Sequence, residues 1–309
     1  MKALIASSYG PVDQLTVTDV TKPVPAAGQV LIKVRAASLN ALDIRLTTGA
    51  FREQMPVEHP FHLGLDAAGT VEVVGEGVSR FTAGDEVVAF TYPFFGTVAE
   101  YALAGEGPNL VHRPKSLSPE AAAALPQAAM TAAAAHDAAQ LKSGQSALVI
   151  GASGGVGSFL VQLAHRSGAQ VLATGKPEDE AYLRRLGAVE TIDYTGKDVV
   201  EEARRLRPDG VDVVIDLINA GPGLAATAAA ARNAGLLVST LGGAPGFERG
   251  VTVAYVGVDQ GVGQLEDLVR RAAEGQLDVQ VETFPFSRAV EAAQRFAGSH
   301  SRGKLVITF

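Results

Sequence analysis

Short apolar runs separated by turn residues occupy the first 118 residues of the chain. Runs with the length of β-strands lie at 1–7, 14–20, 29–39, 69–75 and 85–90. Gly, Pro and Asp interrupt them, for example at Gly10-Pro11 and at Gly84-Asp85. Many short strands with turn signals between them predict a compact, barrel-like β domain.

The pattern changes to alternating strands and helices after residue 146. Buried strands are expected at 147–151, 170–175, 190–194, 211–217, 235–242 and 251–256. Amphipathic helices are expected between them, near 156–167, 178–186, 198–206 and 222–233. This alternation predicts an α/β domain with a parallel sheet and helices on both faces.

The segments on either side of this alternating region have a different pattern of apolar and polar residues. An alanine-rich segment, 119–141, reads as helical and precedes the alternation. Two amphipathic helices at 264–277 and 287–299 and a last strand at 304–309 follow it. We therefore expect the α/β domain, residues 121–256, to be inserted into a domain built from residues 1–120 and 257–309.

A glycine-rich turn lies between the first strand and the first helix of the α/β domain. The stretch 147–158 reads ALVIGASGGVGS, with small residues at Ala152, Gly154 and Gly157. Small residues allow a pyrophosphate to approach the backbone, and the helix N-terminus offers it N–H groups. The turn predicts a dinucleotide site at Ser153, Gly154, Gly155 and Val156; the alternative is a βα turn without a ligand.

Composition narrows the possible functions. The formal net charge is −7 and there is no basic block, so nothing points to nucleic acid as a partner. The chain has no cysteine, which excludes disulfides, thiol chemistry and cysteine-based zinc sites. No apolar stretch has the character of a signal peptide or a membrane span. We expect a soluble cytoplasmic protein.

Several motifs, taken in order, resemble the zinc-free quinone oxidoreductase (zeta-crystallin-like) branch of the medium-chain dehydrogenase/reductase superfamily. They are N-A-L-D at 40–43, G-L-D-A-A-G-T-V at 64–71, G-T-V-A-E-Y at 96–101, L-P at 125–126, T-A at 131–132 and G-K-L-V at 303–306. The resemblance covers essentially the whole chain. It implies a Rossmann nucleotide-binding domain inserted into a GroES-like β-barrel domain. It also implies a homodimer joined through the Rossmann sheet edge, here residues 251–256.

The same resemblance predicts that the protein works without zinc. Zinc members of the superfamily carry a cysteine where Asn40 stands, and G-H-E where this chain has Gly64, Leu65 and Asp66. Their cysteine-rich lobe is also missing. His59, His62 and Asp66 remain as a metal constellation, but a loop with half-exposed histidines is the favoured interpretation. We predict no metal site.

The end of the second strand favours NADPH over NADH. An NAD site usually carries an acid there, whereas this chain has Thr174 and then Lys176, which suit a 2′-phosphate. The alternative for Lys176 is a solvated lysine beside the acids at 178–180. By resemblance, Tyr194 lies near this phosphate and Thr131 near the nicotinamide; plain packing and a helical threonine bonded to its own backbone are the alternatives. Further cofactor contacts are expected at Asn219, Leu241, Gly242 and Lys304.

The resemblance implies hydride transfer from C4 of NADPH to a quinone or to an α,β-unsaturated carbonyl. Candidate catalytic residues are Asn40, Tyr92 and Thr131, and the acceptor pocket is expected to contain Asn40, Phe51, Tyr92, Phe94 and Phe95. Phe51 replaces the family's tyrosine and Thr47 its arginine, so the proton source stays open between Tyr92 and water. Asn40 either bonds the acceptor oxygen or caps a turn. Three readings follow: a quinone reductase, an enone reductase, and a non-catalytic NADPH-binding or sensor protein.

Overall fold

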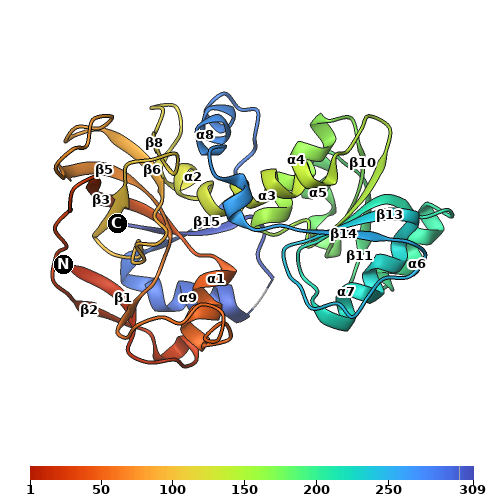
Figure 1. Ribbon diagram of the computed structural model, residues 1–309, viewed down its shortest axis with the longest axis horizontal. Coiled ribbons are helices and arrows are strands. Elements are labelled where there is room, and N and C mark those ends of the chain that lie inside the picture. The colour runs from red at the N-terminus through yellow and green to blue at the C-terminus, as the bar shows by residue number, and fades with distance from the viewer. Residues whose placement is uncertain (299) are drawn as a thin grey trace. The chain divides into compact units, whose positions relative to one another are not determined.

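The computed structural model describes residues 1–298 and 300–309 and divides into two compact units. The first unit comprises Met1–Gln127 and Val262–Phe309, and the second comprises Ala128–Gly261. The boundaries between the units along the chain are 127/128 and 261/262, a few residues after the expected boundaries at 120/121 and 256/257. Figure 1 shows that both ends of the chain belong to the first unit.

Two sheets form the first unit. Lys2–Ala6 (β1) lies between Thr16–Asp19 (β2) and Phe61–His62 (β4) in an antiparallel sheet. The larger sheet has the order β15-β16-β3-β5-β6-β8, with β7 paired to β3. Its strands are Val281–Pro285 (β15), Lys304–Thr308 (β16), Gln29–Ser38 (β3), Asp66–Val74 (β5), Glu86–Phe90 (β6), Leu110–His112 (β8) and Tyr101–Gly105 (β7).

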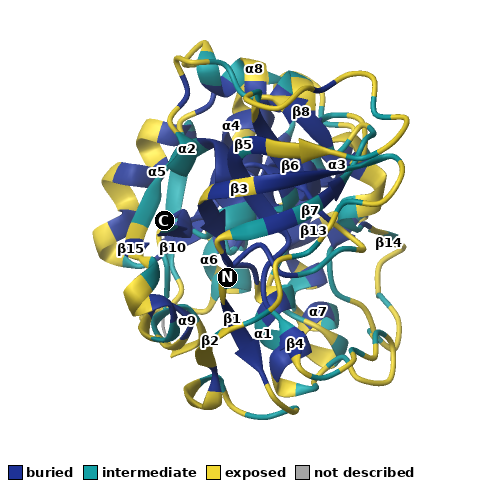
Figure 2. Cartoon of the chain, turned by 90° about the vertical axis from the view of Figure 1, so that its left-hand side faces the viewer, coloured by how far each residue is buried: buried dark blue, intermediate teal, exposed yellow. Residues whose placement is uncertain are grey.

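The central strands of the larger sheet are buried more than an alternating pattern would make them. β3 and the first part of β5 are mostly dark blue in Figure 2, whereas the end of β5 is exposed. One apolar cluster includes Leu4, Leu39 and Ile307, and a second includes Ile32 and Phe81. These clusters hold β3, β5 and β16 in place, and the polar residues at their ends are held with them.

Helices of the first unit connect or cover its strands. A short helix that the hydrophobic pattern did not predict, Ala41–Thr48 (α1), follows β3 directly. The helices of the C-terminal segment are Leu265–Ala273 (α8) and Ala289–Gly298 (α9). They lie within the helices expected at 264–277 and 287–299. α8 ends four residues before 277, a 3₁₀ turn at Phe286–Arg288 precedes α9, and Ser299 lies outside the described residues.

The segment expected to be helical, 119–141, is helical over most of its length. The structure has two helices, Pro119–Ala123 (α2) and Pro126–Ala139 (α3), separated at Ala124 and Leu125. Proline has no N–H to donate to a preceding turn, but it suits the first turn of a helix. Pro126 therefore ends one helical stretch and begins the next.

The second unit is a doubly wound α/β domain. All pairings of its six-stranded sheet are parallel, in the order β11-β10-β9-β12-β13-β14. The strands are Ser146–Ile150 (β9), Gln170–Gly175 (β10), Ala188–Asp193 (β11), Val211–Asp216 (β12), Ala231–Ser239 (β13) and Thr252–Tyr255 (β14). The helices Gly155–Arg166 (α4), Glu180–Leu186 (α5), Val199–Leu206 (α6) and Gly221–Thr227 (α7) connect them. The parallel sheet and its strand order confirm the predicted Rossmann domain.

The helix expected at 222–233 is too long. α7 ends at Thr227, a 3₁₀ turn covers Ala228–Ala230, and β13 begins at Ala231, which pairs with Val211 of β12. The Arg204 guanidinium also binds the carbonyl oxygens of Ala229 and Ala231. Strand pairing here outweighs the helix propensity of the alanines. In the described part of the chain, no helix is long and apolar enough to cross a membrane.

Candidate active site

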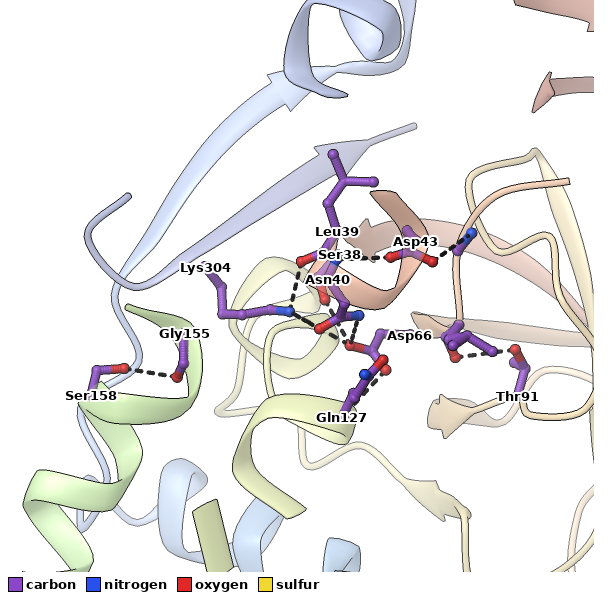
Figure 3. A network of polar contacts seen from close by, with 12 residues as sticks. Ser38, Leu39, Asn40, Asp43, Asp66, Thr91, Gln127, Gly155, Ser158 and Lys304 are labelled. Atoms are coloured by element: carbon purple, nitrogen blue, oxygen red, sulfur yellow. Dashed lines mark hydrogen bonds and ion pairs between the residues drawn. The ribbon is translucent and has the colours of Figure 1, made fainter. Parts of the chain in front are cut away.

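Asp66, at the start of β5, is the centre of a buried polar network in the first unit (Figure 3). β3 and β5 pair with Ser38 opposite Asp66, and the Ser38 hydroxyl donates to Asp66 Oδ2 over 2.9 Å. Asn40 Nδ2 donates to the same oxygen over 2.9 Å. The backbone N–H of Gln127 donates to Oδ1 over 3.1 Å. These donors favour the ionised carboxylate.

Lys304 brings a positive charge into this network. It is the first residue of β16, and its side chain is 3% exposed. The ammonium donates to Leu39 O over 2.8 Å and to Asn40 Oδ1, and it lies 3.8 Å from Asp66 Oδ2. Burial lowers the pKa of Lys304 and raises that of Asp66, and the attraction between the two groups opposes both shifts. The sequence predicts Lys304 as a cofactor contact. In the structure its ammonium contacts Leu39, Asn40 and Asp66, all residues of the first unit.

A second buried carboxyl group, Asp43, holds the turn from β3 into α1. Asn40 is the N-terminal cap residue of α1, and its backbone N–H donates to Asp43 Oδ2 over 2.8 Å. Asp43 Oδ1 accepts the N–H of Gly64 over 3.2 Å. Burial, which outweighs these donors, and the nearby Asp66 raise the pKa of Asp43 to about 7. Asp43 therefore titrates much nearer neutral pH than a free carboxyl group does.

Gly64 has a steric requirement of its own beside Asp43. Its φ is +100°, a conformation that favours glycine, and a Cβ there would lie 2.3 Å from Thr97 Oγ1. Hydrophobic periodicity did not single out Asp43, Asp66 or Ser38 as functional residues. The available signal was indirect, because both aspartates belong to the motifs at 40–43 and 64–71.

The predicted aromatic residues follow β6 or lie close to the core of the first unit. Tyr92 is 48% exposed, and its ring makes an edge contact with Phe95 at 6.0 Å between centroids. Phe95 in turn contacts Phe61. Phe51 is half-buried against the core, with the Arg45 guanidinium 5.1 Å from its ring centroid. The half-buried Phe94 lies next to Phe95 in sequence.

The glycine-rich turn of the second unit joins β9 to α4. A Cβ on Gly157 would lie 2.1 Å from Gly151 O, so only glycine lets the helix pack this closely on the turn. At Gly154 a Cβ would meet only Gly151 O, at 3.5 Å. Gly154 is the N-terminal cap of α4 and supplies no side-chain cap. The first N–H groups of α4 thus suit a phosphate.

The other residues predicted in this turn support its shape. Ser153 is buried, Val156 is half-buried, and Gly155 is the first residue of α4. The carbonyl oxygen of Gly155 accepts a hydrogen bond from the Ser158 hydroxyl over 3.0 Å (Figure 3). Thr174 is also buried, and its hydroxyl accepts the N–H of Gly151 over 3.0 Å. Thr174 therefore fixes the turn, and its contact with a 2′-phosphate stays a prediction.

One of the acids at 178–180, Asp179, lies in the 3₁₀ turn that follows β10, with a role that sequence reasoning did not assign. Asp179 is 1% exposed, and its carboxylate accepts the backbone N–H of Lys176 over 3.3 Å. Tyr194, 42% exposed, is near this acid. Partial burial raises the pKa of Tyr194, as do the charges of Asp179, Glu178 and Asp193. Lys176 thus stands beside several negative charges.

The predicted contacts at the later strand ends are also ordered by hydrogen bonds. Asp216, fully buried at the end of β12, accepts from the side chain of Asn219 over 2.9 Å and from the hydroxyl of Thr227 over 2.6 Å. The Ser239 hydroxyl donates to Leu241 O over 2.6 Å. The carbonyl of Gly242 accepts the N–H of Gly221. Thr131, in α3, is 8% exposed.

The residues at the superfamily's zinc positions do not fit zinc. Zinc prefers thiolate, imidazole and carboxylate ligands. Here Asn40 presents an amide, and Asp66 already accepts several hydrogen bonds and faces the Lys304 ammonium. Across residues 1–298 and 300–309, no three His, Cys, Asp or Glu side chains form a group that could hold a metal ion.

Comparisons with known proteins agree with this geometry. A family model described as alcohol dehydrogenase GroES-like domain matches residues 26–115, and one described as zinc-binding dehydrogenase matches residues 186–307. An NADPH-dependent alkenal/one oxidoreductase of Arabidopsis thaliana chloroplasts is 36% identical over 99% of this chain and 79% of its own length.

Two further proteins match the chain over nearly their whole length. A chloroplast envelope quinone oxidoreductase homolog of Arabidopsis thaliana is 33% identical over 99% of this chain and 98% of its own length. The solved structure of the quinone oxidoreductase from Coxiella burnetii is 29% identical, with a TM-score of 0.89, and covers 100% of this chain and 99% of its own.

Proposed function

Because the chain belongs to the quinone oxidoreductase-like branch of the medium-chain dehydrogenase/reductase superfamily, we propose that it is an NADPH-dependent reductase of quinones. The observation that carries the proposal is the turn from β9 to α4. Its glycines and its uncapped helix N-terminus suit the pyrophosphate of a dinucleotide. The acceptor class is that of the quinone oxidoreductases among the relatives.

The coenzyme, when bound, supplies a hydride from C4 of its nicotinamide ring. The acceptor gains this hydride and one proton, and NADPH becomes NADP⁺. Negative charge develops on the acceptor's carbonyl oxygen, and a hydrogen-bond donor at that oxygen stabilises it. We assign this donor to Asn40, which is 7% exposed and whose second Nδ2–H has no partner among the described residues.

Ser153, Gly154, Gly155 and Val156 hold the pyrophosphate in this proposal. Lys176 holds the 2′-phosphate, with Thr174 and Tyr194 beside it. Asn219, Leu241 and Gly242 contact the coenzyme at the ends of β12 and β13. Thr131 approaches the nicotinamide. The name of the Arabidopsis NADPH-dependent alkenal/one oxidoreductase supports the choice of NADPH.

Phe51, Tyr92, Phe94 and Phe95 line the acceptor pocket in this proposal. Either the Tyr92 hydroxyl or water supplies the proton, and Tyr92→Phe distinguishes the two. A catalytic hydroxyl contributes roughly 10²–10⁴-fold to the rate, so its loss lowers kcat by that factor. Proton transfer from solvent leaves kcat within about twofold, because a phenylalanine ring keeps the contact with Phe95.

A second candidate function is the reduction of α,β-unsaturated carbonyl compounds. The name of the alkenal/one oxidoreductase favours it. Hydride addition at the β-carbon produces an enolate, whose oxygen needs the same donor as a reduced quinone. The site chemistry proposed for Asn40 is therefore common to both acceptor classes.

The test is a titration of the purified protein with NADPH and NADH by nicotinamide fluorescence, followed by addition of acceptors. Oxidation of NADPH with 1,4-benzoquinone or 9,10-phenanthrenequinone supports quinone reduction. Turnover of 3-buten-2-one or 2-hexenal without turnover of either quinone selects the enone reductase. Tight NADPH binding without turnover of any acceptor selects a non-catalytic binding or sensor role. Failure to bind either nucleotide overturns the proposal.

We also propose a cytoplasmic homodimer joined through β14. This strand forms one edge of the second unit's sheet, and Tyr255 on it is 46% exposed. An exposed edge strand can pair with the same strand of another copy. The net charge of −7 and the lack of a basic block support a protein that binds neither nucleic acid nor a membrane surface.

A further inference from the structure

Charged groups hold both ends of the Asn40 side-chain amide. The Lys304 ammonium donates to Oδ1, and Nδ2 donates to Asp66 Oδ2 over 2.9 Å. An ammonium group can only donate hydrogen bonds and a carboxylate can only accept them. The amide therefore has one possible orientation, with its oxygen toward Lys304 and its nitrogen toward Asp66.

The two charged groups are themselves fixed by the sheet. Ser38 of β3 lies opposite Asp66 of β5 on one side and opposite Val306 of β16 on the other. Lys304 is two residues before Val306 on β16, and its ammonium is anchored by Leu39 O over 2.8 Å. The Lys304 and Asp66 side chains are 3% and 0% exposed. Three neighbouring strands thus place a cation and an anion around one amide.

A buried ion pair is poor evidence for added stability, because desolvation offsets the attraction between the charges. The arrangement has a chemical consequence for Asn40 instead. A positive charge at Oδ1 draws electron density from the amide nitrogen and strengthens its N–H groups as donors. One N–H is bound to Asp66, so the second is a strengthened donor of fixed direction.

We propose that Lys304 and Asp66 are a positioning pair that holds Asn40 as a hydrogen-bond donor to the carbonyl oxygen of the hydride acceptor. Without Lys304 the amide oxygen loses its partner, so the bond from Nδ2 to Asp66 alone orients the amide and the second N–H is neither strengthened nor held in direction. The inference rests on the proposed function for the acceptor, and it gives Lys304 a role separate from coenzyme binding.

The kinetic test uses Lys304→Met, Lys304→Arg and Asn40→Ala, with Lys33→Met as a control at an exposed lysine of β3. Lys304→Met should lower kcat at least tenfold, since the loss of one oxyanion donor costs about 10²–10³-fold. Its NADPH dissociation constant should stay within about twofold of wild type, and Lys304→Arg should recover part of the rate. Lys33→Met should be unchanged. A weakened NADPH affinity in Lys304→Met would instead make Lys304 a coenzyme ligand and overturn the proposal.

A double-mutant cycle separates action through Asn40 from independent action. In the Asn40→Ala background, Lys304→Met should change kcat by less than about threefold, because the group it positions is already gone. Multiplicative losses would contradict the proposal. Removing both charges in Lys304→Met/Asp66→Asn avoids a lone buried carboxylate if the single variant fails to fold. That variant should show the same low kcat.

A readout without turnover uses the chain's four asparagines, Asn40, Asn109, Asn219 and Asn233. Labelling with ¹⁵N-asparagine gives four side-chain NH₂ pairs, and Asn40→Ala assigns the pair of Asn40. In Lys304→Met that pair should shift and exchange faster with solvent. An unchanged pair would overturn the positioning role. If the wild type reduces no acceptor, the proposed function fails, and this measurement still decides whether the ion pair orients Asn40.

Discussion

The ammonium of Lys304 donates to the side-chain oxygen of Asn40, although the two residues are 264 positions apart in the chain. The contact exists because the last strand, β16, pairs directly with β3, the strand after which Asn40 follows. An amide held in this way is fixed more tightly than a capping residue needs to be. We therefore expect the first unit to be sensitive to substitutions that change hydrogen bonding at this point.

Asn40→Ala should lower kcat by about 10²–10³-fold, because it removes the donor proposed for the acceptor's oxygen. The NADPH dissociation constant should stay within about twofold. Steady-state kinetics with a quinone and an enone, together with a fluorescence titration, check both statements. A kcat within threefold of wild type for both acceptors would refute the role of Asn40.

Two glycines of the β9–α4 turn should respond differently to alanine. Gly157→Ala should destabilise the second unit by about 1–3 kcal/mol, because its Cβ would lie 2.1 Å from Gly151 O. Gly154→Ala should cost less than about 1 kcal/mol, since its Cβ meets only an atom at 3.5 Å. It should nevertheless weaken NADPH binding at least tenfold by filling the space proposed for phosphate. Thermal unfolding and nicotinamide fluorescence measure the two effects, and unchanged binding in Gly154→Ala would contradict the pyrophosphate assignment.

Lys176→Ala should weaken NADPH and spare NADH. A hydrogen bond to a charged group is worth roughly 1.5–3 kcal/mol, or about tenfold to a hundredfold in affinity. Lys142→Ala, at an exposed lysine of the same unit, is the matched control and should change neither affinity. An equal loss for both coenzymes in Lys176→Ala would argue against the 2′-phosphate contact.

Asp43 should make the stability of the protein depend on pH. Its pKa is about 7 in the folded chain, against 3.8 for the unperturbed group. A group with a raised pKa contributes stability that is present below pH 4 and is lost as the pH rises through 7. For Asp43 alone this loss amounts to about 4 kcal/mol.

Asp43→Asn removes this titration and tests the prediction. It should flatten the decline of the unfolding free energy between pH 4 and pH 7. It should also lower stability at pH 4, since one of the N–H groups of Asn40 and Gly64 then faces an amide NH₂. Chemical denaturation over this range provides the measurement. Parallel pH curves for variant and wild type would show that Asp43 does not titrate here.

Tyr255→Asp should convert the proposed dimer to a monomer, because a charge on the edge strand β14 opposes strand pairing. Val189→Asp is the matched control, at an exposed valine of β11 on the opposite edge of the same sheet. Sedimentation velocity gives the mass of each variant. A monomeric wild type, or a dimer that survives Tyr255→Asp, would contradict the proposed interface.

The sequence by itself determined the parts of this protein that depend on local pattern. The parallel sheet of the second unit and most of its helices follow from periodicity, and the β9–α4 turn follows from glycines whose space is needed within a few residues. Local pattern misjudged Ala228–Ala231, where pairing with β12 outweighed helix propensity.

Only the tertiary structure decided which charges surround Asn40. Asp66 and Lys304 come from distant strands, and the pairing of β5 and β16 with β3 brings them to one amide. Hydrophobic periodicity reports which face of an element is buried, but not which polar groups meet across strands. Which polar residue lies opposite another depends on the strand order and register of the sheet, and both depend on the packing of the whole unit.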